Sequence, residues 1–248
     1  MSTFDESKIR RGQPDNSGQF AAKPNSAPAA ALAQTPQPDP EMRDISVRHE
    51  AQAQKAYQEY VDAEASRASG VLTQHHPDLV EARYMSDWDG SLGYPSSWVD
   101  SEGTVHDFSS REYGELNMDS LDAEAAGLEF DEDTEGWTLT VAEHASPDGA
   151  AGAAGRSWKA YSRYIEQESE ASAYDVLSFH PEAVHVEYGV SESGDLGYPV
   201  AWYEQDGTRH SGNLQYLRAL NMDSTDAENA GLEMVGDGYL LPVEERMG

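Results

Sequence analysis

Leu-Gly-Tyr-Pro at residues 92–95 recurs at 196–199, and Leu-Asn-Met-Asp-Ser at 116–120 recurs at 220–224. These blocks belong to a longer repeat, because residues 55–130 align with 159–234 at a constant offset of 104 residues without a gap. Thirty of the 76 aligned positions are identical. Self-similarity of this kind predicts two copies of one small domain, although the repeated blocks name no chemistry.

Hydrophobic periodicity predicts the order of elements within each copy. Apolar side chains recur at three- and four-residue steps in the opening segment, as in an amphipathic helix, and then alternate in three short segments separated by turns. A second helical region, broken near Met118, and a last strand complete the copy. The expected fold class is α+β, with two tandem copies of a helix–three-strand–helix–strand domain and a disordered N-terminal tail. In the first copy these elements are expected at 45–68, 80–85, 92–99, 104–106, 110–127 and 136–141.

Three kinds of side chain inside the repeat carry structural expectations. Pro95 and its copy Pro199 lie within the middle strand, so that strand is expected to be bulged there or to lie at a sheet edge. Trp98 and Trp202 are expected to be buried against the helix. The helical tyrosines at 57 and 60, repeated at 161 and 164, are interpreted as core packing in preference to a binding platform.

Composition divides the chain into four segments. The first 45 residues are rich in Pro, Ala, Gln, Ser and Asn, which is typical of a disordered tail. The run of Gly and Ala between the two copies indicates a flexible linker. The expected boundaries are a tail at 1–45, repeat domain 1 at 46–142, a linker at 143–156 and repeat domain 2 at 157–248.

The formal charge of −30 and the pI of about 4.3 restrict the partners of this protein. Residues 1–45 hold five basic and six acidic side chains, so the remainder carries −30 − (−1) = −29. Such a field repels nucleic acids and anionic membranes and favours a protein with a basic surface as partner. The chain has no cysteine and no apolar run of membrane-spanning length, and we expect a cytoplasmic location. The sequence does not indicate an oligomeric state.

The tail contains Arg11, then Gly18-Gln19-Phe20-Ala21, then Lys23. This pattern resembles the N-terminal tails of many uncharacterised actinobacterial and actinophage proteins. The resemblance covers less than a tenth of the chain and implies a source in an actinobacterium or its mobile elements, with no fold or activity attached. Phe20 is either an incidental residue of a solvated tail or the centre of a short docking motif.

A site inherited from one ancestral domain should occur in both copies. Among the histidines, His76 matches His180 and His106 matches His210, which makes the latter pair weak candidates for metal ligands. Packing is the preferred interpretation, with the first pair next to Pro capping a helix and the second facing Trp. The matched acidic residues are candidates for an acidic binding surface, although helix capping explains them equally well. They are Asp119, Asp122 and Glu124 in the first copy and Asp223, Asp226 and Glu228 in the second.

Other chemistry has little support in the sequence. The acidic turn at 87–90 resembles the start of a calcium loop, but its copy lacks the pattern. The chain has no Gly-x-Ser-x-Gly, no Walker loop and no dinucleotide fingerprint, so we expect no cofactor and no catalytic residues.

Three functional hypotheses follow from the sequence. The first is a non-enzymatic acidic interaction module, in its narrowest form a DNA-mimicking decoy, since 30 charges match those of roughly 15 base pairs. The second is a structural or virion-associated assembly protein. The third is a metal-binding domain or hydrolase that uses the duplicated His and acidic positions.

Overall fold

The structure is a computed structural model. It describes residues 37–86, 92–109, 116, 123–132, 134–191 and 194–243, apart from the side chain of Asn221. The expectations for the tail before residue 37, for the acidic turn at 87–90 and for Asp119 and Asp122 lie outside the described residues. Within them the chain is a mixed α and β protein, as the repeat pattern predicts.

The first helix, α1, spans Pro40–His75 and is longer than the sequence pattern indicates. Asp39 caps it, because its side chain accepts hydrogen bonds from the backbone N–H groups of Glu41 and Met42. Pro40 follows at the first helical position, where a missing N–H costs nothing. The expected tail boundary at residue 45 is therefore wrong, and the helix includes the last six residues assigned to the tail.

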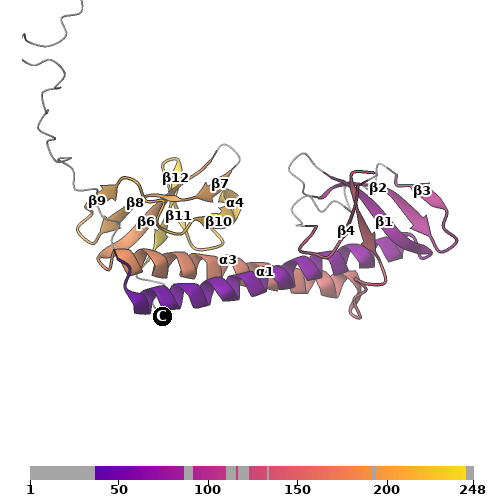
Figure 1. Cartoon of the computed structure of the whole chain (residues 1–248), viewed down its shortest axis with the longest axis horizontal. Coiled ribbons are helices and arrows are strands. Elements are labelled where there is room, and N and C mark those ends of the chain that lie inside the picture. Colours follow the sequence, from indigo (N-terminus) through magenta and orange to yellow (C-terminus); the bar gives the residue numbers. More distant parts are fainter. Residues whose placement is uncertain are drawn as a thin grey trace, which may run out of the picture. The chain divides into compact units, whose positions relative to one another are not determined.

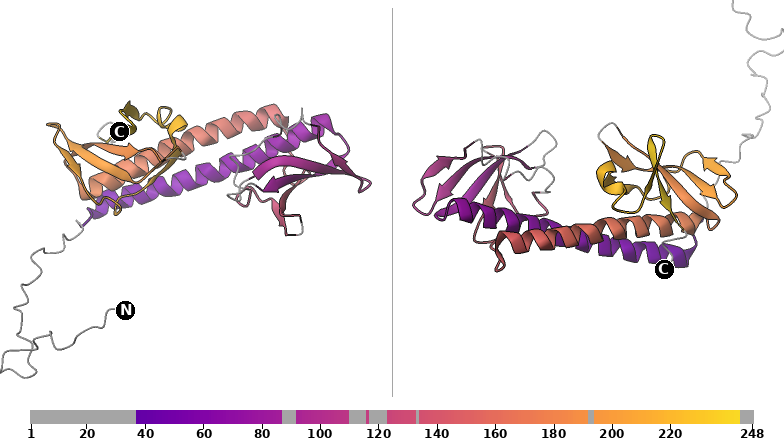
Figure 2. Two further views of the ribbon diagram at one scale, coloured as in Figure 1. Left: turned by 90° about the horizontal axis from the view of Figure 1, so that it is seen from above. Right: turned by 180° about the vertical axis from the view of Figure 1, so that it is seen from behind.

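The second long helix, α3, spans Gly149–Phe179 and runs antiparallel along α1. The start of α1 lies beside the end of α3, since the backbone N–H of Asp39 donates to the carbonyl of Ser178 at 2.6 Å. Farther along, Ser46 Oγ donates to the carbonyl of Ala171 at 2.8 Å. Figures 1 and 2 show the two helices side by side.

The expected flexible linker at 143–156 is wrong for its Gly/Ala-rich part, because residues 149–156 form the first two turns of α3. Two physical reasons account for the difference. Alanine has the highest helix propensity, and small side chains let two helices approach closely. A Cβ atom at Gly70 of α1 would lie only 2.7 Å from the backbone nitrogen of Ala150, which shows how close the approach is.

Two five-stranded antiparallel sheets follow the two long helices (Figure 1). The first has the order β3-β2-β1-β5-β4, and the second has the corresponding order β9-β8-β6-β12-β11. The expected three-stranded meander is present in each, while the short edge strands β4 and β11 were not expected. A separate two-stranded ladder joins β10 to β7. The bounds are β1 Leu79–Ser86, β2 Leu92–Asp100, β3 Val105–Asp107, β4 Glu129–Asp131, β5 Gly136–Thr140, β6 Ala183–Gly189, β7 Asp195–Gly197, β8 Pro199–Glu204, β9 Arg209–Ser211, β10 Leu220–Asp223, β11 Glu233–Val235 and β12 Gly238–Pro242.

Both repeated prolines lie at bulges. In the first sheet Arg83 pairs with Ser97 but Tyr84 pairs with Pro95, so one residue of β2 is left over. In the second sheet Glu187 pairs with Ala201 but Tyr188 pairs with Pro199, so one residue of β8 is left over in the same way. The bulge removes the need for a ladder hydrogen bond from a residue that has no N–H, and the first of the two expected solutions is confirmed.

The expected second helical region is largely wrong in the second copy. Residues 220–223 form β10, and the only helix in that stretch is α4, Ser224–Ala227. Asp223 caps α4 by accepting from the backbone N–H groups of Thr225 and Asp226, as expected. The helix ends quickly, and Gly231 adopts a left-handed backbone with φ of 76°. Most of the corresponding region of the first copy lies outside the described residues.

Each sheet packs on one half of a long helix. The second half of α1 contributes Val61, Ala65 and Leu72 to a core with Leu139 and other residues of the first sheet. The second half of α3 contributes Ile165 and Val176, among others, to a core on the second sheet. The first half of each helix is then available to pair with the other helix.

Candidate functional site

Four tyrosines form a layer of rings where the middles of α1 and α3 meet. Tyr57 lies against Tyr164 with ring centroids 5.2 Å apart, and Tyr60 lies against Tyr161 at 4.9 Å. The offset of 104 residues exchanges these two contacts, because 57 + 104 = 161 and 60 + 104 = 164. Each tyrosine thus meets the counterpart of its neighbour across the helix pair, since Tyr164 is the counterpart of Tyr60 and Tyr161 is the counterpart of Tyr57.

A cavity of about 650 Å³ opens above this layer. The rest of its lining comes from β7, β10 and α4, which supply three carboxylates. Among the described residues that line it, none is Lys or Arg. The lining consists of Tyr57, Tyr60, Tyr161, Tyr164, Asp195, Gly197, Leu220, Met222, Asp223 and Asp226. We call this cavity the Tyr–Asp pocket.

Two carboxylates of the pocket are neighbours across a strand pair, and the third contacts the tyrosine layer. Asp195 and Asp223 are direct cross-strand partners in the β7–β10 ladder. Like charges in that relation repel each other. Asp226 accepts a hydrogen bond from the hydroxyl of Tyr161 and so connects α4 to α3. The pocket therefore joins an aromatic surface to a concentrated negative charge.

The electrostatic environment of the tyrosines reflects that charge. Burial is the main cause that raises the pKa of Tyr161, and the hydrogen bond to Asp226 and the charges of Asp226 and Asp223 raise it further. Burial also raises the pKa of Tyr164, with a contribution from Glu168. The phenols stay neutral because burial disfavours charge and the nearby carboxylates disfavour negative charge in particular. The carboxylates, unlike the burial, favour a positively charged group.

The structure separates the predicted acidic residues. Asp223 and Asp226 line the Tyr–Asp pocket, whereas Glu228 is exposed and outside the lining. Glu124 is exposed in a turn of the first copy. Sequence reasoning missed Asp195, because its counterpart is Ser91 and the requirement for both copies rejects it.

The tyrosine interpretation was correct but incomplete. Tyr57 and Tyr60 pack against the core of the first sheet, and Tyr161 and Tyr164 pack against that of the second, as expected. The same rings also line the Tyr–Asp pocket. The sequence contained one signal for the pocket. The tyrosine pair is identical in both copies, and each copy also has matched acidic residues in a segment expected to cap a helix.

The duplicated histidines each stack on a tryptophan. Trp98 lies between His76 and His106, with centroid distances of 4.4 and 4.2 Å. Trp202 lies between its two histidines at 4.4 and 3.9 Å. The two histidines of each set contact the same indole, which leaves no room for them to face one another across a shared ion. Hydrogen bonds to carboxylates hold the strand histidines, His106 to Asp100 at 2.8 Å and His210 to Glu204 at 2.7 Å.

Packing and capping therefore account for both histidine pairs. His76 and His180 end α1 and α3, where their backbone N–H groups donate to carbonyls of the last turn. Trp202 is buried, as expected, and Trp98 is partly buried. In the described part of the chain, no three His, Asp or Glu side chains come together in a way that could hold a metal ion.

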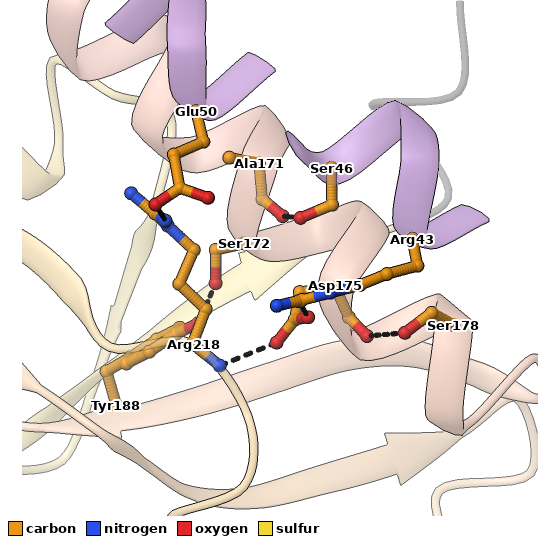
Figure 3. Close-up of polar contacts among 9 residues, drawn as sticks. All are labelled: Arg43, Ser46, Glu50, Ala171, Ser172, Asp175, Ser178, Tyr188 and Arg218. Carbon is orange, nitrogen blue, oxygen red and sulfur yellow. Dashed lines mark hydrogen bonds and ion pairs between the residues drawn. The ribbon is translucent and has the colours of Figure 1, made fainter. Parts of the chain in front are cut away.

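A second charged cluster serves to join the helices. Figure 3 shows Asp175, which is fully buried, accepting from the guanidinium of Arg43 on α1. Asp175 also accepts from the backbone N–H of Arg218 at 2.6 Å. The Arg218 side chain in turn pairs with Glu50 of α1 and Glu168 of α3, both at 2.7 Å. These ion pairs hold the first half of α1 against the second half of the chain.

A smaller cavity of about 380 Å³ lies on the helix pair. Its lining mixes Glu59 and Asp62 with Arg156, Lys159 and Arg163. Glu59 and Arg163 form an ion pair across the helices. Because opposite charges already compensate one another there, the Tyr–Asp pocket is the stronger candidate for a ligand of one charge sign.

None of the helices within the described ranges is both long and apolar enough to cross a membrane. No protein-family model, curated protein or solved structure matches the chain.

Proposed function

We propose that this protein is a non-enzymatic acidic interaction module that binds a partner protein through the partner's basic surface. The observation that carries the proposal is the Tyr–Asp pocket, whose described lining has three carboxylates and no basic side chain. The pocket belongs to a chain with a formal charge of −30, so its local potential and the surrounding field have the same sign. Complementary charge increases the rate of encounter with a basic partner and discriminates against acidic ones.

The proposal includes an origin by tandem duplication. Three observations support it: the 30 identities in 76 aligned positions, the corresponding strand order of the two sheets, and the exchange of tyrosine contacts by the 104-residue offset. A duplicated acidic domain offers two related surfaces to one partner. A partner that normally binds nucleic acid fits this description, and the DNA-decoy form of the proposal predicts that duplex DNA competes for binding.

The test is a capture experiment with the full chain as bait in an extract of the source organism. A matched pair of variants makes the test specific to the pocket. Asp195→Asn with Asp226→Asn removes two charges from the pocket, and Glu228→Gln with Glu233→Gln removes two charges from exposed positions outside it. Both variants have the same net charge, so any difference between them depends on position.

We expect a basic protein that is retained by the wild type and by the Glu228/Glu233 variant, lost from the Asp195/Asp226 variant, and released as salt rises. Mass spectrometry identifies the protein, and competition with a DNA duplex tests the decoy form. If both variants retain the same proteins, or if the retained proteins resist high salt, the acidic interaction proposal is wrong. Salt-resistant retention would favour a structural assembly role.

A further inference from the structure

We propose that the Tyr–Asp pocket receives an arginine side chain from the partner, with the guanidinium on the tyrosine layer and its N–H groups directed to the carboxylates. This inference rests on the proposed function, since it names the group of the basic partner that the site recognises.

The ring spacing decides which kind of cation fits. Neighbouring tyrosine centroids are 4.9 to 6.1 Å apart. A cation enclosed between two rings needs about 7 Å between them, twice a contact distance of about 3.5 Å. The rings are tilted by 40 to 52° to one another and form a faceted platform, so a ligand lies on a ring and not between two rings. A flat group can stack on one ring of such a platform, and among side chains the planar guanidinium does this best.

The carboxylates of the lining supply the matching acceptors. Asp195 and Asp223 are directly opposed in the β7–β10 ladder, where a cation would relieve the repulsion between them. Asp226 stands beside the platform, oriented by its hydrogen bond from Tyr161. A guanidinium has five N–H donors in a rigid fork and can contact two carboxylates at once, whereas an ammonium is a compact point charge.

The cavity is large enough for more than one side chain. A volume of about 650 Å³ falls in the middle of the range of about 300 to 1,000 Å³ that is usual for ligand pockets. We therefore assign the pocket to an arginine with its flanking residues, in an exposed segment of the partner. Of the two apolar side chains of the lining, Leu220 is fully buried, and Met222 can contact the methylene part of the arginine.

The experiment measures the affinity of the full chain for three six-residue peptides made of arginine, lysine or uncharged citrulline, by calorimetry at equal ionic strength. General attraction to a chain of −30 should treat hexa-arginine and hexa-lysine alike. Recognition by the pocket should favour hexa-arginine by about tenfold, because only the planar guanidinium can stack on a ring and contact two carboxylates at once. The preference should vanish in the Asp195→Asn, Asp226→Asn variant and persist in the Glu228→Gln, Glu233→Gln control. Labelled tyrosine rings should shift in the NMR spectrum only with hexa-arginine.

Three results would overturn the inference. One is equal affinity for hexa-arginine and hexa-lysine, and another is a preference for arginine that survives in the pocket variant. The third is full displacement of hexa-arginine by spermidine at matched ionic strength, which would assign the pocket to a small polyamine. Each of these leaves the proposed function intact if a basic partner is still captured in a pocket-dependent way. Failure to capture any such partner, with hexa-arginine still bound in the pocket, would instead reject the proposed function.

Discussion

Replacing Gly70 by alanine tests the close approach of the two long helices. In an open helix the change should stabilise the protein by about 1 kcal/mol, because glycine has a low helix propensity. At Gly70, however, the added Cβ would lie 2.7 Å from the nitrogen, 2.9 Å from the Cα and 2.9 Å from the Cβ of Ala150. Two of these three atoms are backbone and cannot rotate away. Overpacking of this kind costs about 1–3 kcal/mol, so we expect a net loss of about 1 kcal/mol.

Gly155 provides the matched control. It lies in α3, is exposed, and a Cβ built on it meets nothing within 4 Å. Gly155→Ala should therefore stabilise the protein by about 1 kcal/mol, and the two variants should differ by about 2 kcal/mol. With a urea slope of about 2 kcal/mol per molar, their unfolding midpoints followed by circular dichroism should differ by about 1 M. If Gly70→Ala proves as stabilising as Gly155→Ala, the helices do not approach closely at Ala150 and the assignment of the Gly/Ala segment to the helix pair is wrong.

Three other perturbations test the remaining structural claims. Burial lowers the pKa of His180 in the folded protein, so the unfolded chain takes up a proton first as pH falls. The free energy of unfolding should therefore decline from about pH 7 to pH 5, and His180→Gln should flatten that decline in urea titrations. An unchanged profile in this variant would show that another group is responsible. Asp175→Ala removes the buried acceptor of the Arg43 side chain and of the Arg218 backbone N–H, and should lower the free energy of unfolding by about 2 kcal/mol. Asp175→Asn should lower it less, because asparagine retains an acceptor. Equal losses would mean that the charge matters more than the hydrogen bonds. Finally, the fragments 1–145 and 146–248, co-expressed, should co-elute in gel filtration because α1 and α3 pack along their lengths, whereas two separate folded monomers would refute that interdependence.

The parts of the fold that were correctly predicted depend on neighbours in sequence. Alternation of apolar side chains located the meander strands, and the missing N–H of Pro95 required the bulge that β2 contains. Asp223 was recognised as a cap because capping involves residues only two or three positions apart. The matched histidines next to Pro and Trp were likewise correctly assigned to capping and stacking.

The errors arose where a local preference had two possible outcomes. A run of Gly and Ala can be a linker or a tightly packed helix, and the approach of α1 to Ala150 decides in favour of the helix. The local pattern at 220–223 predicts part of a helix, but the pairing with β7 makes this segment a strand. In the same way no sequence pattern indicates Asp195 as a site residue, because its place in the Tyr–Asp pocket depends on its position opposite Asp223 in the β7–β10 ladder.

The sequence by itself determined the repeat, the opening helix and meander strands of each copy, the strong negative charge and the exclusion of thiolate chemistry, because all of these are properties of composition or of short-range order. Only the tertiary structure decided that the two helices pair antiparallel and that the tyrosines of the two copies meet at 4.9 and 5.2 Å in a pocket that three aspartates also line. The physical reason is that the pocket is built from four short segments, 57–60, 161–164, 195–197 and 220–226, which are far apart in the sequence. Their proximity results from burying the surfaces of two long helices against each other, and no periodicity within one segment encodes it.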